Sequence, residues 1–87
     1  MADTFLLEVA TPERLMVREN VSEAQIPAKD GYLGILPGHA ALLSELGSGV
    51  LRYTADGHHH SLRIEGGWLE VKDDCARVLA TAAQAVE

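Results

Sequence analysis

The sequence predicts an all-β fold, and three features support this prediction. Short apolar runs of strand length are separated by glycine, proline and aspartate turn signals at a spacing of about eight to twelve residues. No segment supplies the crossover helices that a parallel α/β sheet would need. The length of 87 residues fits one domain, residues 1–87, whose modest core buries roughly 60% of the unfolded surface. The residues alone are therefore consistent with a β-sandwich or a β-barrel.

The first third of the chain predicts two strands joined by a turn, followed by a weaker strand. Phe5–Val9 is a mostly apolar run, Thr11-Pro12-Glu13 interrupts it, and Leu15–Val17 resumes it. Residues 21–27 alternate weakly and end at a proline, which limits a strand. Lys29-Asp30-Gly31 then has the composition of a turn.

The middle of the chain predicts a strand followed by a β-hairpin. Residues 32–36 form a short apolar run, and another strand begins after Gly49 with residues 50–53. Asp56-Gly57 is a favourable two-residue hairpin turn, so residues 59–64 are expected to return as its partner strand.

The last third contains a bend, a short strand and another turn. Gly66-Gly67 indicates a bend or bulge, after which Leu69 and Val71 alternate with more polar neighbours. Asp73-Asp74 is expected to form the next turn. Residues 76–86 are rich in alanine, and their intrinsic propensity favours helix.

Residues 31–49 carry most of the functional information. They read GYLGILPGHAALLSELGSG, with five glycines and one proline that make the chain turn repeatedly. Six leucine and isoleucine side chains between the turns supply apolar anchors. A loop of this composition is held rigid, and rigid loops often carry function.

Three blocks of the sequence resemble one family at its own spacing. They are VATPERLMV (residues 9–17), QIPAKDGYLGILPGHAALLSELGSGVLRY (25–53) and IEGGWLEVKDDCARVLATAA (64–83). These blocks resemble the N-terminal domain of the ε subunit of F-type ATP synthases, whose mitochondrial counterpart is called δ. The resemblance implies a β-sandwich of short, mostly antiparallel strands in which residues 76–80 form a strand. Residues 81–87 are then expected to be frayed or weakly helical.

The full-length family form continues into a hairpin of two helices. We expect this chain to lack that C-terminal helical domain, so the inhibition of hydrolysis and the ATP binding associated with the hairpin are not transferred to it. The resemblance implies a non-catalytic central-stalk subunit, without a cofactor, that links the γ subunit to the c ring and couples ion translocation to ATP synthesis. It also implies the catalytic α/β assembly as a further partner. The implied location is the cytoplasmic face of the bacterial inner membrane, as a peripheral part of the F1 sector.

The resemblance also suggests two sets of contact residues. Those matched to the face that meets γ are Thr11, His39, Leu43 and Ser44. The alternative is that Thr11 only caps its turn, that His39 makes a structural hydrogen bond, and that Ser44 is solvated. Those matched to the turn that approaches the c ring are Gly31, Tyr32 and Leu33.

Two residues depart from the family pattern. Tyr32 stands where many members have an acidic residue, so the resemblance implies no charge-based contact with the ring at this residue. A tyrosine can instead act as an amphipathic anchor. Ala41 replaces a common proline, which should loosen the loop slightly.

No residue pattern favours catalysis or metal binding. His58, His59 and His60 are adjacent, so at most two share a strand face, whereas a structural zinc site needs four ligands and a catalytic one three. We interpret them as an exposed polar hairpin. His39 lacks the surroundings of a nucleophilic site. Trp68 and Cys75 are interpreted as core or half-buried residues.

The composition excludes several other classes. The net charge is −6 and the seven basic residues are scattered singly, so nucleic acid is not an expected partner. The longest apolar run falls short of the ~20 residues that cross a bilayer, so membrane association would go through the complex. The single cysteine fits a reducing compartment. The alternative function is a free-standing β-sandwich module that binds a ligand or peptide with the GILPGH loop, and an enzyme ranks third.

Overall fold

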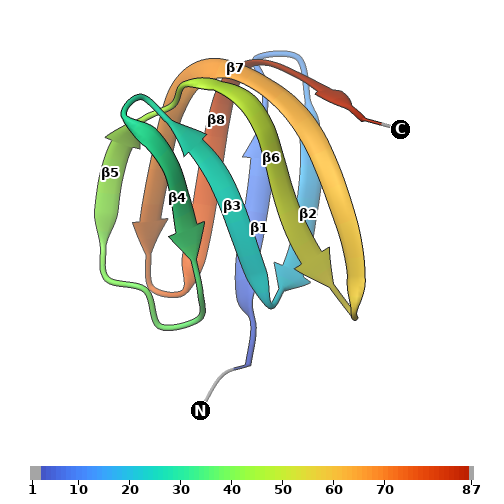
Figure 1. Cartoon of the computed structure of the whole chain (residues 1–87), viewed down its shortest axis with the longest axis vertical. Helices are drawn as coiled ribbons and strands as arrows, with labels where there is room; N and C mark the ends of the chain where they lie inside the picture. The colour runs from blue at the N-terminus through green and yellow to red at the C-terminus, as the bar shows by residue number, and fades with distance from the viewer. Residues whose placement is uncertain (1–2, 87) are drawn as a thin grey trace.

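The computed structural model describes residues 3–86, which form eight β-strands and no helix (Figure 1). The strands are β1 (Phe5–Ala10), β2 (Leu15–Val21), β3 (Glu23–Ala28), β4 (Gly31–Ile35), β5 (Leu42–Glu45), β6 (Ser48–Ala55), β7 (His58–Lys72) and β8 (Cys75–Ala85). The predicted all-β class is confirmed. This part of the chain accordingly contains no helix that could cross a membrane.

The strands form one continuous sheet that folds into the two layers of a β-sandwich. The order is β2-β1-β8-β7-β6-β3-β4, with β5 paired to β7 outside this path. The long β7 strand pairs with β6 along its first half and with β5 along its second half. One layer therefore contains β4, β3, β6 and the first half of β7, and the other contains β5, the second half of β7, β8, β1 and β2 (Figure 1). All pairs are antiparallel except β1 with β8.

The predicted turns are confirmed by their backbone conformations. Asp56 and Gly57 have φ values of 51° and 76°, and Asp73 and Asp74 have 51° and 55°. Positive φ at both central residues gives a two-residue turn whose twist matches the flanking strands, and aspartate tolerates it better than most residues. The chain therefore reverses tightly at both predicted positions.

Gly66-Gly67 is a bend within a strand, because β7 continues through it. Both glycines have positive φ, 54° and 115°, at the place where β7 changes its partner from β6 to β5. A side chain at Gly67 would collide with the backbone of β8 at the Leu79 carbonyl. Glycine is required here because the strand turns from one layer into the other.

Three sequence-based expectations are corrected by the structure. Residues 81–85 belong to β8 and are neither frayed nor helical, because residues 62–65 of β7 pair with residues 82–85 and override the helix propensity of alanine. Glu87 lies outside the described residues. Residues 21–27 do not form one strand, since β2 ends at Val21 and β3 begins at Glu23. The four-residue β5 strand was not expected.

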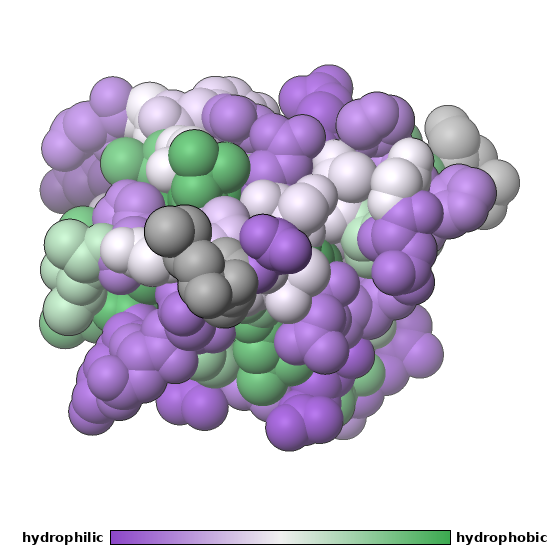
Figure 2. Space-filling view, turned by 90° about the horizontal axis from the view of Figure 1, so that it is seen from below, coloured by the Kyte–Doolittle hydropathy of each residue, from purple (hydrophilic) through white to green (hydrophobic). Residues whose placement is uncertain are grey.

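The two ends of the sandwich differ in the loops that they carry. The end near the N-terminus holds the connection between β4 and β5 and the turn between β7 and β8, which are joined by a hydrogen bond from the Gly38 N–H to the Asp74 carboxylate at 2.7 Å. Seen from this end, the surface is mainly hydrophilic, with separate hydrophobic patches (Figure 2). The opposite end holds the connections after β1, β3 and β5.

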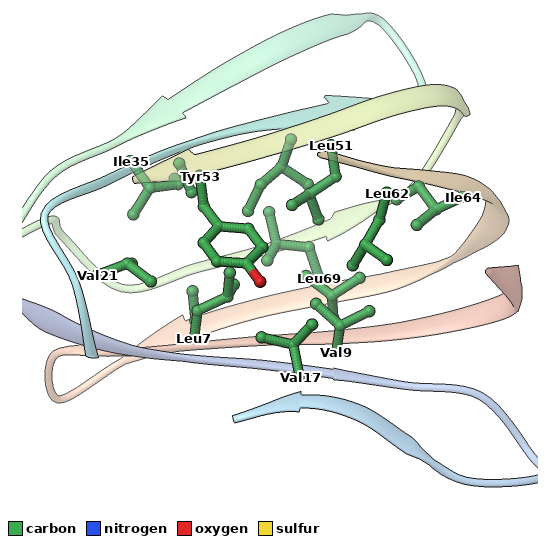
Figure 3. Packing of buried hydrophobic residues seen from close by; sticks show 14 of the residues in the cluster. Leu7, Val9, Val17, Val21, Ile35, Leu51, Tyr53, Leu62, Ile64 and Leu69 are labelled. Carbon is green, nitrogen blue, oxygen red and sulfur yellow. The ribbon is translucent and has the colours of Figure 1, made fainter. Parts of the chain in front are cut away.

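The core lies between the two layers. Leu7, Val9 and Leu69 from one layer meet Leu51 and Ile64 from the other, and all five are fully buried (Figure 3). Among residues 3–86 no polar or charged residue is buried. The interior is therefore a close-packed apolar core, and chemistry and recognition are confined to the surface.

Candidate partner-binding surfaces

A mainly apolar row, with a glutamate at one end, crosses the outer face of the layer that contains β5, β7, β8, β1 and β2. The strand registers place five residues side by side: Glu45, Trp68, Leu79, Ala10 and Leu15. Trp68, Leu79 and Leu15 are 52%, 50% and 54% exposed. We call these five residues the Trp68 row. Exposed apolar side chains that adjoin one another in this way are typical of an interaction surface.

A groove runs along the Trp68 row at the end of the sandwich opposite the N-terminus. Its lining includes Thr11, Trp68, Leu79 and Thr81. The groove therefore joins the turn after β1 to the centre of the apolar row. It offers a partner a concave contact beside large apolar side chains.

A row of alternating charges lies next to the Trp68 row on the same face. It consists of Glu70, Arg77, Glu8 and Arg18, which the strand registers place in this order. Arg77 contacts Glu70 at 3.5 Å and Glu8 at 3.1 Å, and Arg18 contacts Glu8 at 2.9 Å. We call these four residues the charged row. The carboxylates and guanidinium groups of this row form ion pairs with one another. The row gives the Trp68 row a polar border along one side.

Glu8 is the central residue of the charged row. Its side chain is only 17% exposed because an arginine covers it on each side. The hydrogen bond from Arg77, followed by that from Arg18, lowers the pKa of the Glu8 carboxyl, and Glu8 in turn raises the pKa of Arg77. The carboxylate is thus held in its charged form.

Thr11 lies in the turn between β1 and β2 and has a structural role there. Its Oγ1 accepts hydrogen bonds from the N–H groups of Glu13 at 3.3 Å and Arg14 at 3.4 Å. The side chain of Thr11 therefore caps its turn, as the alternative interpretation proposed. Thr11 also lines the groove with Trp68, so a partner that fills this groove would contact it.

Leu43 and Ser44 lie next to each other on β5 but face opposite ways. Leu43 is 69% exposed on the outer face, opposite Glu70 of the charged row. Ser44 is half-buried on the other side, and its hydroxyl donates to the Glu45 carbonyl at 3.1 Å. Since side chains alternate along a strand, one flat partner surface on this face reaches Leu43 and not Ser44.

His39 lies in the connection between β4 and β5, at the end of the sandwich near the N-terminus. Its ring Nδ1 is 2.7 Å from the Ala40 carbonyl, which can only accept, so this nitrogen carries the proton. The adjacent Gly38 is hydrogen-bonded to Asp74, just before β8. Thr11 follows the other end of β1, so His39 and Thr11 are separated by roughly 15–20 Å along the strands.

The residues expected to approach the c ring lie at the start of β4. Gly31 has φ 129°, a conformation that suits glycine, at the β3–β4 turn. Tyr32 is 53% exposed, whereas Leu33 is partly buried against the core. Tyr32 is therefore the large side chain that this turn offers to a partner.

The β3–β4 turn is hydrogen-bonded to the connection between β5 and β6. The Lys29 N–H donates to the Glu45 carbonyl at 3.0 Å, and the Gly47 N–H donates to the Pro27 carbonyl at 3.0 Å. The Lys29 ammonium also lies 3.7 Å from the Glu45 carboxylate. Glu45 belongs to the Trp68 row, so the β3–β4 turn is bonded directly to a residue of that row.

The histidines of the β6–β7 hairpin are used in separate local contacts. His59 Nδ1 lies 3.0 Å from Thr54 Oγ1, which donates to Glu23 at 3.1 Å. The His60 ring stacks on Tyr53 with centroids 4.9 Å apart. In residues 3–86 no group of three or more histidine, cysteine or acidic side chains is placed to hold a metal ion.

The position of Trp68 differs from the one that its sequence context suggested. It was expected to be core or half-buried, but it lies on the outer face because the buried Leu69 and Val71 turn their neighbours outward. The alternation of β7 contained this information, although the size of the tryptophan favoured the core. Cys75 is half-buried as expected, and burial raises the pKa of its thiol.

Comparison with known proteins identifies close sequence relatives. The family model described as "ATP synthase, Delta/Epsilon chain, beta-sandwich domain" matches residues 4–86. The ATP synthase epsilon chain of Solibacter usitatus is 55% identical over the whole chain, and that of Koribacter versatilis is 47% identical over the whole chain. The chain spans 65% and 61% of the length of these two relatives.

Solved structures match the fold at lower sequence identity. A chain in the Euglena gracilis mitochondrial ATP synthase, in a structure of OSCP, F1 and c ring, matches with a TM-score of 0.89 and 22% identity. The match covers 98% of this chain and 55% of that one. A chain in the central stalk and c-ring structure of the Tetrahymena thermophila mitochondrial ATP synthase matches with a TM-score of 0.77 and 17% identity, covering 92% and 65%. These two matches establish the β-sandwich fold.

Proposed function

The chain belongs to the ATP synthase delta/epsilon chain β-sandwich family, and from this premise we propose that it is a non-catalytic stalk subunit linking the γ subunit to the c ring. In this role it passes rotation of the ring, driven by ion flow, to the γ shaft. The names of the sequence relatives support the assignment to the ATP synthase. The structural matches occur in assemblies that contain a c ring.

The observation that carries the γ contact is the outer face with the Trp68 row. Leu43, Trp68 and Leu79 expose large apolar surfaces on this face, and the charged row borders them. A stable interface combines an apolar centre with a polar rim, and this face has both. We therefore assign the γ contact to Leu43, the Trp68 row and the groove beside Thr11. His39 extends it toward the end near the N-terminus.

The c-ring contact is assigned to Gly31, Tyr32 and the start of β4. This turn is hydrogen-bonded through Lys29 to Glu45, a member of the Trp68 row. Force applied at the turn is therefore transmitted to the γ-binding face through backbone bonds and a packed core, without a flexible loop between them. Transmission of this kind is the mechanical requirement of a stalk subunit.

The location follows from the partners. We place the chain peripherally, at the cytoplasmic face of a bacterial inner membrane, with its membrane association provided by the c ring. The catalytic α/β assembly is a further neighbour in the F1 sector. The relatives with the higher identities are from bacteria, which supports this location.

The test is co-elution with the γ subunit of the same organism. The parent chain is compared with Leu43→Asp, which places a charge on the proposed face, and with Gln25→Asp, which places the same charge on an exposed strand position of the other layer. We expect the parent and Gln25→Asp to co-elute with γ and Leu43→Asp to elute separately. If the folded parent elutes apart from γ but binds a peptide or small ligand alone, the free-standing binding module is the better description.

A further inference from the structure

The β3 and β6 strands separate before either of them ends. They pair through Glu23, Ala24 and Gln25 of β3, and the ladder stops there. Beyond this point Pro27 has no N–H to donate, and its carbonyl accepts from Gly47. The facing edge of β6 around Val50 is thus left without a strand partner on this side.

Tyr32 supplies the missing partner. Its hydroxyl accepts a hydrogen bond from the Val50 N–H at 3.0 Å. The side chain reaches this amide from β4 by crossing over Pro27, with which Tyr32 is paired in the β3–β4 ladder. A side-chain oxygen therefore replaces the strand carbonyl that the separated ladder does not provide.

The glycine before Val50 makes room for this contact. A Cβ at Gly49 would collide with the Tyr32 hydroxyl and would press on the Pro27 side chain at 3.1 Å. The φ of Gly49 is not in the left-handed region, so the need for glycine here comes from space alone. The sequence is thus matched to the tyrosine at position 49, where a side chain would displace the hydroxyl.

The bond changes what Tyr32 can offer to a partner. Its hydroxyl is directed toward β6, whereas 53% of the residue is exposed. The aromatic ring is the larger part of this side chain, so a partner that meets Tyr32 contacts mainly apolar surface. Together with the bonds of Lys29 and Gly47, the Tyr32 bond ties the β3–β4 turn to β5 and β6 at three points.

We propose that Tyr32 is a positioning residue: its hydroxyl fixes the β3–β4 turn against β6, and this holds the aromatic ring for an apolar contact with the c ring. The second half of this statement rests on the proposed function, and the first half does not. Tyrosine thereby presents an aromatic ring, and no charge, at this position.

The first half is tested by amide hydrogen exchange of the isolated chain. In Tyr32→Phe the ring stays and the bond to Val50 is lost, so the Val50 amide should exchange roughly five- to tenfold faster. The core amide of Val78 should be unchanged, which shows that global unfolding is not responsible. Tyr53→Phe is the matched control because it removes the other tyrosine hydroxyl and leaves the Val50 amide as in the parent. An unchanged Val50 rate in Tyr32→Phe would overturn the proposal.

The second half is tested by binding to a purified c ring that carries γ. Tyr32→Phe should bind several-fold more weakly than the parent and Tyr53→Phe although its aromatic ring is intact, and Tyr32→Leu should be weaker still. If Tyr32→Phe binds like the parent although its Val50 amide exchanges faster, the aromatic ring of residue 32 does not depend on the hydroxyl for its position. If the parent itself fails to bind, the proposed function fails, whereas the exchange result for the hydroxyl stands.

Discussion

Trp68 and Leu79 lie directly opposite each other across the β7–β8 ladder, and each keeps about half of its surface exposed. Large apolar pairs of this kind normally cover one another or turn into the core. Here the core positions are filled by Leu69 and Val78, which alternate with the pair along the same strands. The exposed pair is therefore available for a partner.

The first prediction concerns Trp68→Ala. We expect it to weaken binding to γ by about tenfold or more, since a central aromatic residue often contributes about 2 kcal/mol or more to an interface. The midpoint of thermal unfolding should change little because the side chain is half exposed. Titration calorimetry with γ and a thermal melt measure the two effects. Arg52→Ala, at an exposed position of the other layer, is the control and should bind as the parent does.

The second prediction concerns Gly67→Ala. A Cβ at this position collides with the Leu79 carbonyl and touches the Ala80 Cα, and φ is 115°, so we expect a loss of about 3 kcal/mol or more in the free energy of unfolding. Gly57→Ala is the matched control. Its φ is 76° but its Cβ meets open space, so its cost should be about 1–2 kcal/mol. Urea unfolding of both variants decides the point, and equal losses would contradict the steric explanation.

The third prediction is an acid dependence that comes from Glu8. Its pKa in the folded chain is lowered from the ordinary value of 4.5, so its stabilisation is present in full above that value and is lost as the pH falls below it through the folded pKa. Glu8→Gln should remove this part of the dependence. Urea midpoints measured from neutral to acidic pH, at low and high salt, provide the test. Parallel curves for parent and variant would exclude the charged row as the cause.

The fourth prediction is an alkaline dependence that comes from Tyr53. Burial, and then the hydrogen bond to Glu19 at 3.0 Å, raises the pKa of Tyr53 from 10.0 to about 12. The folded chain therefore keeps this proton after the unfolded chain has released it, so stability is full below pH 10 and falls as the pH rises toward 12. Ultraviolet titration of tyrosinate in parent and Tyr53→Phe should show the late-titrating group in the parent alone.

Much of the fold could be predicted from local patterns. The Asp56-Gly57 and Asp73-Asp74 turns were identified because their residue types suit positive φ. The alternation around Leu69 was also recognised, but Trp68 was still expected to be core or half-buried. Residues 81–85 were not predicted as strand. Their alanine-rich sequence favours helix, and what decides their conformation is pairing with β7, a tertiary contact that no local window contains.

Less of the candidate site could be predicted from the sequence. The matched residues Thr11, His39 and Leu43 span the length of a face, but the Trp68 row is assembled from five strands and depends on their order. The hydroxyl of Tyr32 is a similar case, because its bond to Val50 exists only where β3 and β6 separate. Both features are consequences of topology and not of spacing in the sequence.

The parallel pairing of β1 with β8 also has a consequence for biosynthesis. Glu8 and Arg77 are hydrogen-bonded across 69 positions of the chain, and β1 leaves the ribosome long before β8 does. β1 can pair early with β2, but its other edge stays open until β8 has been made. Because contacts of such long range slow folding, closure of the sandwich is a late step of folding, and the nascent chain carries an unpaired strand edge until then.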